Sequence, residues 1–361
     1  MLVFSGSSNQ TLAKKLAKEL GTRLGKVELA RFSNDEARIW INESNPGKTA
    51  VLVQSLSAPT DQNLVEFCLI ADALQRLGVK RIVAVIPWLG YSKQDKVFRP
   101  GEPLSVKVIA KMLQVVPLEK VITFDLHNLA IPGFFEVPVV NLSGRKVFRE
   151  IFSKRITDRT VIAAVDAGSV KSSERFSEDL GGVPLVYMNK IRDLTTGKVV
   201  YKSMSESVEG KTVLIKDDLI STGNTLVEAA KFLKANGAGV IDVCATHHLY
   251  VPGAQEKLDN SPMNQIMVTD TVEPRSKSKK LKVVSVAKMI AEEISIPVSI
   301  RKAFGIDGAT KAVLEKKGDK MIIKPQKSFW QLSGGMKSKI KLTDKQLRAA
   351  RDSFETSWAQ E

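Results

Sequence analysis

The chain alternates between short apolar runs and longer segments in which apolar residues recur every three or four positions. The short runs are rich in β-branched residues and lack polar alternation, a pattern typical of strands buried on both faces of a parallel sheet. The longer segments predict amphipathic helices, since Leu12, Leu16 and Leu20 share one face of such a helix. The expected strands are 1–4, 50–54, 81–86, 121–124, 161–165, 183–187, 212–215 and 240–246. Further helical faces are formed by Leu64, Cys68, Ala71 and Leu74, and by Leu226, Ala230 and Leu233 before Asn236-Gly237.

Strand–helix–strand alternation over about 290 residues predicts an α/β fold made of βαβ units, in two halves that divide near residue 145. In such folds ligands bind beyond the carboxyl ends of the strands. After residue 290 the pattern changes to a short strand at 294–297, helical turns at 298–304, and a hairpin turn at Gly318-Asp319 between strands 311–316 and 320–324. A capping box of Thr343 and Gln346 opens a last helix. The expected domains are therefore 1–145, 146–292 and 293–361.

The balance of charged residues indicates which classes of partner suit the chain. Lys and Arg number 54 against 39 Asp and Glu, a net charge of +15. This excess favours nucleotides, sugar phosphates or nucleic acid, although it also serves solubility alone. Cys68 and Cys244 lie in apolar runs and are interpreted as core thiols of a reducing compartment. No apolar run approaches the ~20 residues of a membrane span, and residues 1–4 resemble a strand rather than a signal, so we expect a cytoplasmic protein without a membrane partner.

The strongest local signal is residues 213–225. A buried strand leads to Asp217 and Asp218, and a turn of small residues, Ser221 to Thr225, opens the helix near Leu226. Such a turn leaves backbone amides and the positive end of the helix dipole free to hold a phosphate, while two carboxylates can accept hydrogen bonds from a vicinal diol. The alternative is an acidic strand end followed by an ordinary helix cap. Gly-Lys-Thr is missing, so this is not a Walker loop.

This run resembles the phosphoribosyl pyrophosphate loop shared by type I phosphoribosyltransferases and ribose-phosphate pyrophosphokinases. Five more segments resemble the pyrophosphokinases in order and spacing: 4–8, 32–36, 91–96, 125–127 and 133–138. Transferases of this fold lack the N-terminal half, so the whole of residues 1 to about 290 resembles the ribose-phosphate pyrophosphokinase family. The resemblance implies two phosphoribosyltransferase-type parallel-sheet domains.

The resemblance also implies a reaction: diphosphate passes from ATP to the 1-hydroxyl of ribose 5-phosphate, giving 5-phosphoribosyl 1-pyrophosphate and AMP, with Mg²⁺, in a homo-oligomer that is a hexamer in the family. Such a transfer depends on in-line positioning and on cations around the spreading negative charge. A phosphoribosyltransferase remains an alternative.

Site residues follow from the resemblance, position by position. The adenine contacts would be Phe32, Asn34, Asp35 and Glu36, and the ATP phosphate contacts Lys93, Gln94 and His127. The metal positions would be His127 and Asp166. Lys190 would stabilise the transition state and Arg192 would bind substrate phosphate; both follow strand 183–187 and suit a mobile lid, the alternative being two solvated cations. The ribose 5-phosphate contacts would be Arg192, Asp217, Asp218, Ser221, Thr222, Gly223, Asn224 and Thr225.

Several positions depart from the family pattern. Lys93 stands where arginine is usual, so a bidentate fork becomes a point charge. Ala164-Val165 replaces Ser-Pro before Asp166, and residues 98–102 differ from the common pattern. Ser221 and Asn224 replace aspartate and glycine. These departures leave open a second hypothesis, a DNA-binding regulator that senses nucleotides through a degenerate enzyme domain.

Residues 294–306 and the following hairpin resemble an AbrB-type swapped-hairpin domain, and 327–330 with the terminal helix resemble the toxin-contacting tail of antitoxins in that family. The resemblance implies dimerisation and DNA binding. An oligomer-forming appendage is the alternative. The candidate phosphate contacts are Arg301, Lys302, Lys316, Lys317 and Lys320.

Overall fold

The structure is a computed structural model that describes residues 1–192, 199–294, 312–317 and 320–325. Two compact units divide the chain, Met1–Ser295 and Ile296–Glu361. Expected features that lie outside the described residues include the helical turns at 298–304, Arg301, Lys302 and the segment from 327 to the end of the chain. Within the described part, no helix is both long enough and apolar enough to cross a membrane.

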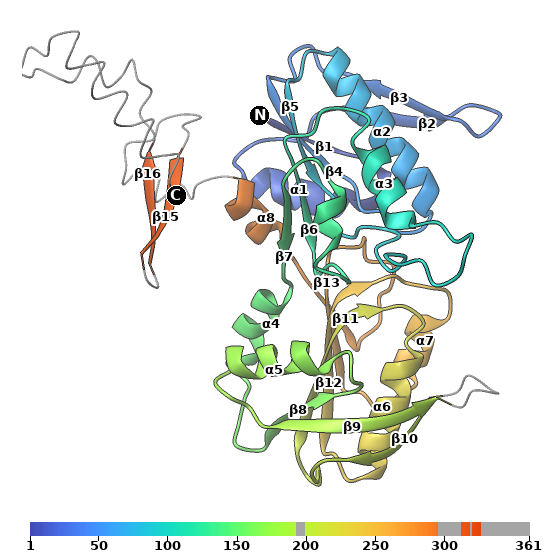
Figure 1. Cartoon of the computed structure of the whole chain (residues 1–361), viewed down its shortest axis with the longest axis vertical. Helices are drawn as coiled ribbons and strands as arrows, with labels where there is room; N and C mark the ends of the chain where they lie inside the picture. The colour runs from blue at the N-terminus through green and yellow to red at the C-terminus, as the bar shows by residue number, and fades with distance from the viewer. Residues whose placement is uncertain (193–198, 295–311, 318–319, 326–361) are drawn as a thin grey trace, which may run out of the picture. The chain divides into compact units, whose positions relative to one another are not determined.

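The first sheet of unit Met1–Ser295 has five parallel strands in the order β1-β4-β5-β6-β7 (Figure 1). Alternate residues of each strand point to opposite faces, so Leu52 packs with helices α2 and α3 and Val53 packs with α1 and α8. The strands are β1 (Leu2–Ser5), β4 (Thr49–Val53), β5 (Arg81–Val85), β6 (Lys120–Phe124) and β7 (Val139–Leu142). The helices are α1 (Gln10–Glu19), α2 (Thr60–Arg76), α3 (Ser105–Leu113) and α8 (Ala287–Ile294), and a separate antiparallel hairpin joins β2 (Val27–Arg31) to β3 (Ala37–Ile41).

The second sheet has seven strands in the order β10-β9-β8-β11-β12-β13-β14, parallel except for the antiparallel pair β9–β10. One face packs with α4 and α5 and the other with α6. The strands are β8 (Thr160–Ala164), β9 (Leu185–Arg192), β10 (Val199–Met204), β11 (Thr212–Ile220), β12 (Val240–His248), β13 (Gln265–Thr269) and β14 (Leu281–Val284). The helices are α4 (Arg145–Phe152), α5 (Val170–Asp179), α6 (Asn224–Ala235) and α7 (Ala254–Asp259), and two 3-10 turns, Ser7–Asn9 and Ile131–Phe134, lie in the first half.

The α/β fold class is confirmed, but strand ends differ from the expectation. β11 continues through Asp217 and Asp218 to Ile220, because β12 is long enough to pair with it as far as His248. The acids therefore lie within the strand rather than after it, and α6 begins at Asn224 instead of near Leu226. Similarly, β9 continues through Lys190 to Arg192 because β10 pairs with it, so these residues are in a strand and not beyond its end.

The last helix of the first unit returns to the N-terminal sheet. Ile290 and Ala291 of α8 are buried in the same cluster as Leu12 and Leu16 of α1. Ile294 consequently ends a helix, which corrects the expectation that a strand begins there. The rest of the expected strand 294–297 lies outside the described residues. The predicted domain boundaries stay a prediction.

The described part of unit Ile296–Glu361 is an antiparallel hairpin. β15 (Ala312–Lys317) pairs with β16 (Lys320–Pro325), and Lys317 lies opposite Lys320 in the register. This pairing matches the expected strands on either side of residues 318–319 to within one residue at their ends.

Candidate functional site

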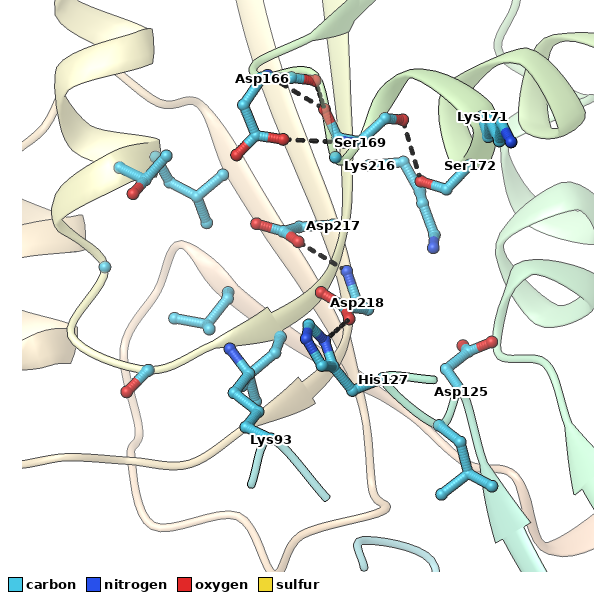
Figure 2. A pocket seen from close by; sticks show the side chains of 18 of the residues that line it. Lys93, Asp125, His127, Asp166, Ser169, Lys171, Ser172, Lys216, Asp217 and Asp218 are labelled. Carbon is cyan, nitrogen blue, oxygen red and sulfur yellow. Dashed lines mark hydrogen bonds and ion pairs between the residues drawn. The ribbon is translucent and has the colours of Figure 1, made fainter. Parts of the chain in front are cut away.

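A cavity of about 690 Å³ lies at the carboxyl ends of strands β6, β8 and β11, where the topology predicts a ligand site (Figure 2). Asp125 directly follows β6, and Asp166 lies two residues after β8. Three segments, 125–129, 166–175 and 216–226, contribute most of its lining, and Lys93 and Asn141 complete it. The cavity is therefore formed by both halves of the first unit.

Two adjacent carboxylates stand inside the cavity on β11. The backbone N–H of Asp218 donates to Oδ1 of Asp217 over 2.8 Å. Burial, together with the neighbouring Asp218, raises the pKa of Asp217. Burial also acts to raise the pKa of Asp218, but hydrogen bonding with Asp217 and the charges of Lys216 and Lys93 outweigh it, and the pKa of Asp218 is lowered. The pair thus gives up its two protons at different pH values, and Asp218 ionises first.

The turn after β11 leaves the start of α6 without a side-chain cap. Gly223 precedes the helix with φ 74°, in the left-handed region, where a side chain would be strained. The first amides of α6 therefore face the cavity, where an anion can accept their hydrogen bonds. Asn224 at the head of this helix accepts a hydrogen bond through Oδ1 from Nζ of Lys257 over 3.0 Å, so its side chain is tied to α7.

Lys190 and Asp166 form an ion pair at the edge of the cavity. Nζ of Lys190 lies 2.6 Å from Oδ2 of Asp166, and the backbone N–H of Ser169 donates to Oδ1 over 2.8 Å. Burial opposes ionisation of Asp166, but the hydrogen bond and charge of Lys190 outweigh it and lower the pKa of Asp166. Lys190 itself lines an adjoining hollow of about 500 Å³ that also borders Asp166.

The expected metal positions, His127 and Asp166, both line the cavity. Nδ1 of His127 lies 3.9 Å from Oδ2 of Asp218, and the imidazole is 47% exposed. Among the described residues, no three His, Cys, Asp or Glu side chains converge as a metal site. Protein ligands alone therefore do not form a complete coordination shell here.

Other expected contacts lie away from the cavity. Phe32, Asn34, Asp35 and Glu36 lie on the connection between β2 and β3, are exposed, and do not line the cavity. Phe32 is 52% exposed, with the guanidinium of Arg38 5.8 Å from its ring centroid. Gln94 also lies outside the lining, where Oε1 accepts from the Ser105 hydroxyl over 2.7 Å. Arg192 ends β9, paired with Val199.

Four charged lining residues were not identified as site candidates by the sequence analysis: Asp125, Lys171, Arg175 and Lys216. Asp125 accepts through Oδ2 from the backbone N–H of Gly144 over 3.0 Å and from the Thr246 hydroxyl, so it fixes neighbouring segments. Lys216 is only 4% exposed. A lone charge between an apolar strand and two acids was the signal that could have identified it.

A buried histidine holds the two halves together behind the site. Nε2 of His247 lies 3.1 Å from the carbonyl oxygen of Phe124, which can only accept, so this nitrogen carries the proton; Nδ1 then accepts from the Thr271 hydroxyl over 2.9 Å. Burial lowers the pKa of His247 to about 4, and the ring remains neutral at physiological pH. The ring of Trp88 packs against it edge-on at 4.7 Å.

A parallel sheet that carries an acid pair and an uncapped helix start defines an enzyme of the phosphoribosyltransferase-type fold. Comparison with known proteins identifies the family within this class of enzymes. Residues 1–116 match the N-terminal domain of ribose phosphate pyrophosphokinase, and residues 201–298 match the phosphoribosyl synthetase-associated domain. The chain belongs to the ribose-phosphate pyrophosphokinase family, as the sequence analysis expected.

Individual relatives agree. A ribose-phosphate pyrophosphokinase of Thermotoga maritima is 37% identical over 309 residues, which cover 85% of this chain and 96% of the relative. One of Wolinella succinogenes is 37% identical over 292 residues, 81% of this chain and 94% of the relative. The crystal structure of phosphoribosylpyrophosphate synthetase from Mycobacterium smegmatis superposes with a TM-score of 0.75 at 31% identity, covering 81% of this chain and 97% of that one.

Proposed function

We propose that this chain transfers diphosphate from ATP to the 1-hydroxyl of ribose 5-phosphate, giving 5-phosphoribosyl 1-pyrophosphate and AMP. The observation that carries the proposal is that one cavity contains the acid pair and free helix start of β11–α6 together with Lys93 and His127 from the other half. One set suits a sugar phosphate and the other suits nucleotide phosphates, so both substrates can meet in one place.

Ribose 5-phosphate is oriented from both ends. The carboxylates of Asp217 and Asp218 accept hydrogen bonds from the 2- and 3-hydroxyls, and the turn residues bind the 5-phosphate through their amides and hydroxyls. This grip fixes the anomeric hydroxyl, and a fixed nucleophile converts a bimolecular collision into an oriented attack. The turn residues in this role are Ser221, Thr222, Gly223, Asn224 and Thr225.

ATP binds through its phosphates at Lys93 and His127, whereas Gln94, the other expected phosphate contact, lies outside the lining of the cavity. Phe32, Asn34, Asp35 and Glu36 would hold the adenine, yet they are exposed on the β2–β3 hairpin and do not line this cavity. We infer that the hairpin completes the adenine site of a second copy of the chain, which agrees with a homo-oligomer, expected to be a hexamer.

The donor set fits Mg²⁺, which needs only one or two protein ligands when substrate phosphates and water supply the rest. His127 and Asp166 line different parts of the cavity, and each would hold Mg²⁺ at a position of its own. Bound Mg²⁺ neutralises charge on the phosphate chain. In this proposal Lys190, which pairs with Asp166, stabilises the charge that spreads over the transferred group, and Arg192, two residues further along, binds substrate phosphate.

The test is AMP release by the whole chain from ATP and Mg²⁺, with and without ribose 5-phosphate. We expect AMP only when the sugar phosphate is present, and none after chelation of the metal. Release of ADP instead of AMP, or no turnover at all, would contradict the proposal, and the second result would favour a nucleotide-sensing regulator. Consumption of 5-phosphoribosyl 1-pyrophosphate with a free base would favour a phosphoribosyltransferase.

For the second unit we propose an AbrB-type module that dimerises and binds DNA in the cytoplasm. The support is the basic sequence around the paired strands β15 and β16. Phosphate contacts make the affinity fall steeply with salt. In a gel-shift experiment, the whole chain should retard duplex DNA at low salt, and joint replacement of Arg301 and Lys302 by alanine should weaken this binding. If neither higher salt nor the double substitution weakens it, the module is excluded as the DNA contact. The other candidate contacts are Lys316, Lys317 and Lys320.

A further inference from the structure

We propose that Lys216 binds the β,γ-diphosphate of ATP, an inference that rests on the proposed diphosphate transfer. Lys216 is 4% exposed and lines the cavity. Among the described residues, its ammonium makes no direct hydrogen bond or ion pair, although its charge acts to lower the pKa values of the neighbouring Asp217 and Asp218. A charge on a side chain that is almost fully buried and has no direct partner is poorly compensated, so its position on the wall of an open polar cavity points to an anionic ligand.

The side chain of Lys216 reaches the cavity because the neighbouring strand β8 ends before this position of β11. β8 pairs with β11 only as far as Ile215, whereas β12 continues alongside with Cys244 opposite Lys216. Lys216 is thus the first residue of β11 beyond its β8 partner. Figure 2 shows its ammonium pointing into the open space between Ser172 and Asp125.

The direction of this side chain separates it from the ribose phosphate turn. Leu214 packs on the α5 face of the sheet and Ile215 on the α6 face, so alternation places Lys216 on the α5 face and Asp217 on the α6 face. Gly223 and the start of α6 belong to the α6 side. Lys216 therefore faces away from the site proposed for the 5-phosphate.

The same side of the cavity carries further positive charge. Lys171 and Arg175 of α5 line it and are exposed, in contrast to the buried Lys216. The diphosphate of ATP must lie near C1 of the ribose, at the far end of the sugar from the 5-phosphate. A buried cation on the α5 side meets that requirement, and it attracts the transferred group more strongly than an exposed one because solvent screens it less.

The experiment compares the parent with Lys216→Met, which keeps the length of the side chain and removes its charge. Three ligands are titrated by calorimetry in the presence of Mg²⁺: α,β-methylene-ATP, which cannot release AMP, AMP itself, and ribose 5-phosphate. One charged hydrogen bond to phosphate corresponds to about a 10- to 100-fold change in affinity. We expect that loss for α,β-methylene-ATP only, with AMP and ribose 5-phosphate within about twofold of the parent.

Lys282→Met is the matched control, because Lys282 is an exposed lysine on β14 of the same sheet and lies outside the cavity. Lys216→Gln provides a second uncharged variant. Unchanged binding of α,β-methylene-ATP, or equal losses for all three ligands, would overturn the assignment, as would failure of both variants to fold, since Lys216 would then be structural. Turnover by the parent is measured separately, so failure of this inference is distinguishable from failure of the proposed reaction.

Discussion

At the scale of single residues, the site depends on how each charge is paired. Lys190 is held by Asp166 at 2.6 Å, and the acids at 217 and 218 influence each other through a direct hydrogen bond. A charged group in such a setting changes both activity and the pH dependence of stability when it is replaced. Two substitutions separate these effects.

Lys190→Ala should lower kcat by about 10²–10³-fold, because one preorganised cation near the transferred group is lost. Steady-state AMP release measures this effect. Lys202→Ala is the control, since Lys202 is exposed on the adjacent strand β10. Turnover of Lys190→Ala at the parent rate would exclude Lys190 from the chemistry.

Asp217→Asn should stabilise the ligand-free protein at pH 8 by roughly 1–3 kcal/mol, the range for a polar group buried without full compensation. The folded chain raises the pKa of Asp217, so the stability that this carboxyl contributes is present below the unfolded value of 3.8 and is lost as the pH rises through the folded pKa. The advantage of asparagine should therefore shrink as the pH falls toward 4.

Urea unfolding at pH 8 and pH 5 measures that difference. Glu206→Gln, an exposed substitution, should show no comparable change between the two pH values. An equal effect of Asp217→Asn at both pH values would show that burial does not hold a proton on this carboxyl. The same variant should bind ribose 5-phosphate more weakly, because an amide donates on one side where a carboxylate accepts.

At the scale of elements, two glycines in the left-handed conformation each precede a helix, and they differ in how closely other side chains surround them. Gly223 before α6 and Gly253 before α7 have φ 74° and 75°. A Cβ at 223 would lie 3.2 Å from Cδ2 of Leu258, whereas a Cβ at 253 would meet nothing within 4 Å. Substitutions at these two glycines therefore distinguish the effect of backbone strain from the effect of steric crowding at the turn before α6.

Gly253→Ala should cost about 1 kcal/mol of stability, the strain of a left-handed side chain. Gly223→Ala should cost more and should also weaken ribose 5-phosphate binding by about tenfold or more, because the turn that presents the α6 amides must shift. Thermal unfolding and calorimetry measure the two effects. Equal behaviour of the two variants would argue against a phosphate site at this turn.

At the scale of the whole molecule, the first unit ends with a helix that belongs to the N-terminal sheet. Ile290 of α8 is fully buried against α1, and Lys120 pairs with Glu293 at 2.7 Å. The pattern change near residue 290 suggests a domain end there, but a cut at that point would remove half of α8.

A chain ending after Ser295 should therefore unfold at a temperature close to that of the full chain and should retain AMP release. A chain ending after Val286 should lose about 2–5 kcal/mol or fail to fold, as expected when a large apolar side chain leaves the core. Scanning calorimetry of the two truncated chains and the full chain measures these differences in stability. Equal stability would show that α8 is dispensable.

The sequence by itself determined the fold class, most strand and helix positions, and the turn of small residues before α6. These features depend on local periodicity and on residue types that few backbones accommodate, such as Gly223 at a left-handed position and the two acids that follow an apolar run. The family was also visible at this level, because several motifs occur in order.

Only the tertiary structure decided where strands end and which charges meet. β11 and β9 continue past their apolar runs because neighbouring strands supply hydrogen bonds, and no local pattern reports the length of a neighbour. The pairing of Lys190 with Asp166, 24 residues apart, and the exposure of Phe32 outside the cavity depend on packing between distant segments. The position of the buried Lys216 at the cavity follows from the same cause, since it lies past the end of β8, and the length of β8 is not encoded in the residues around position 216.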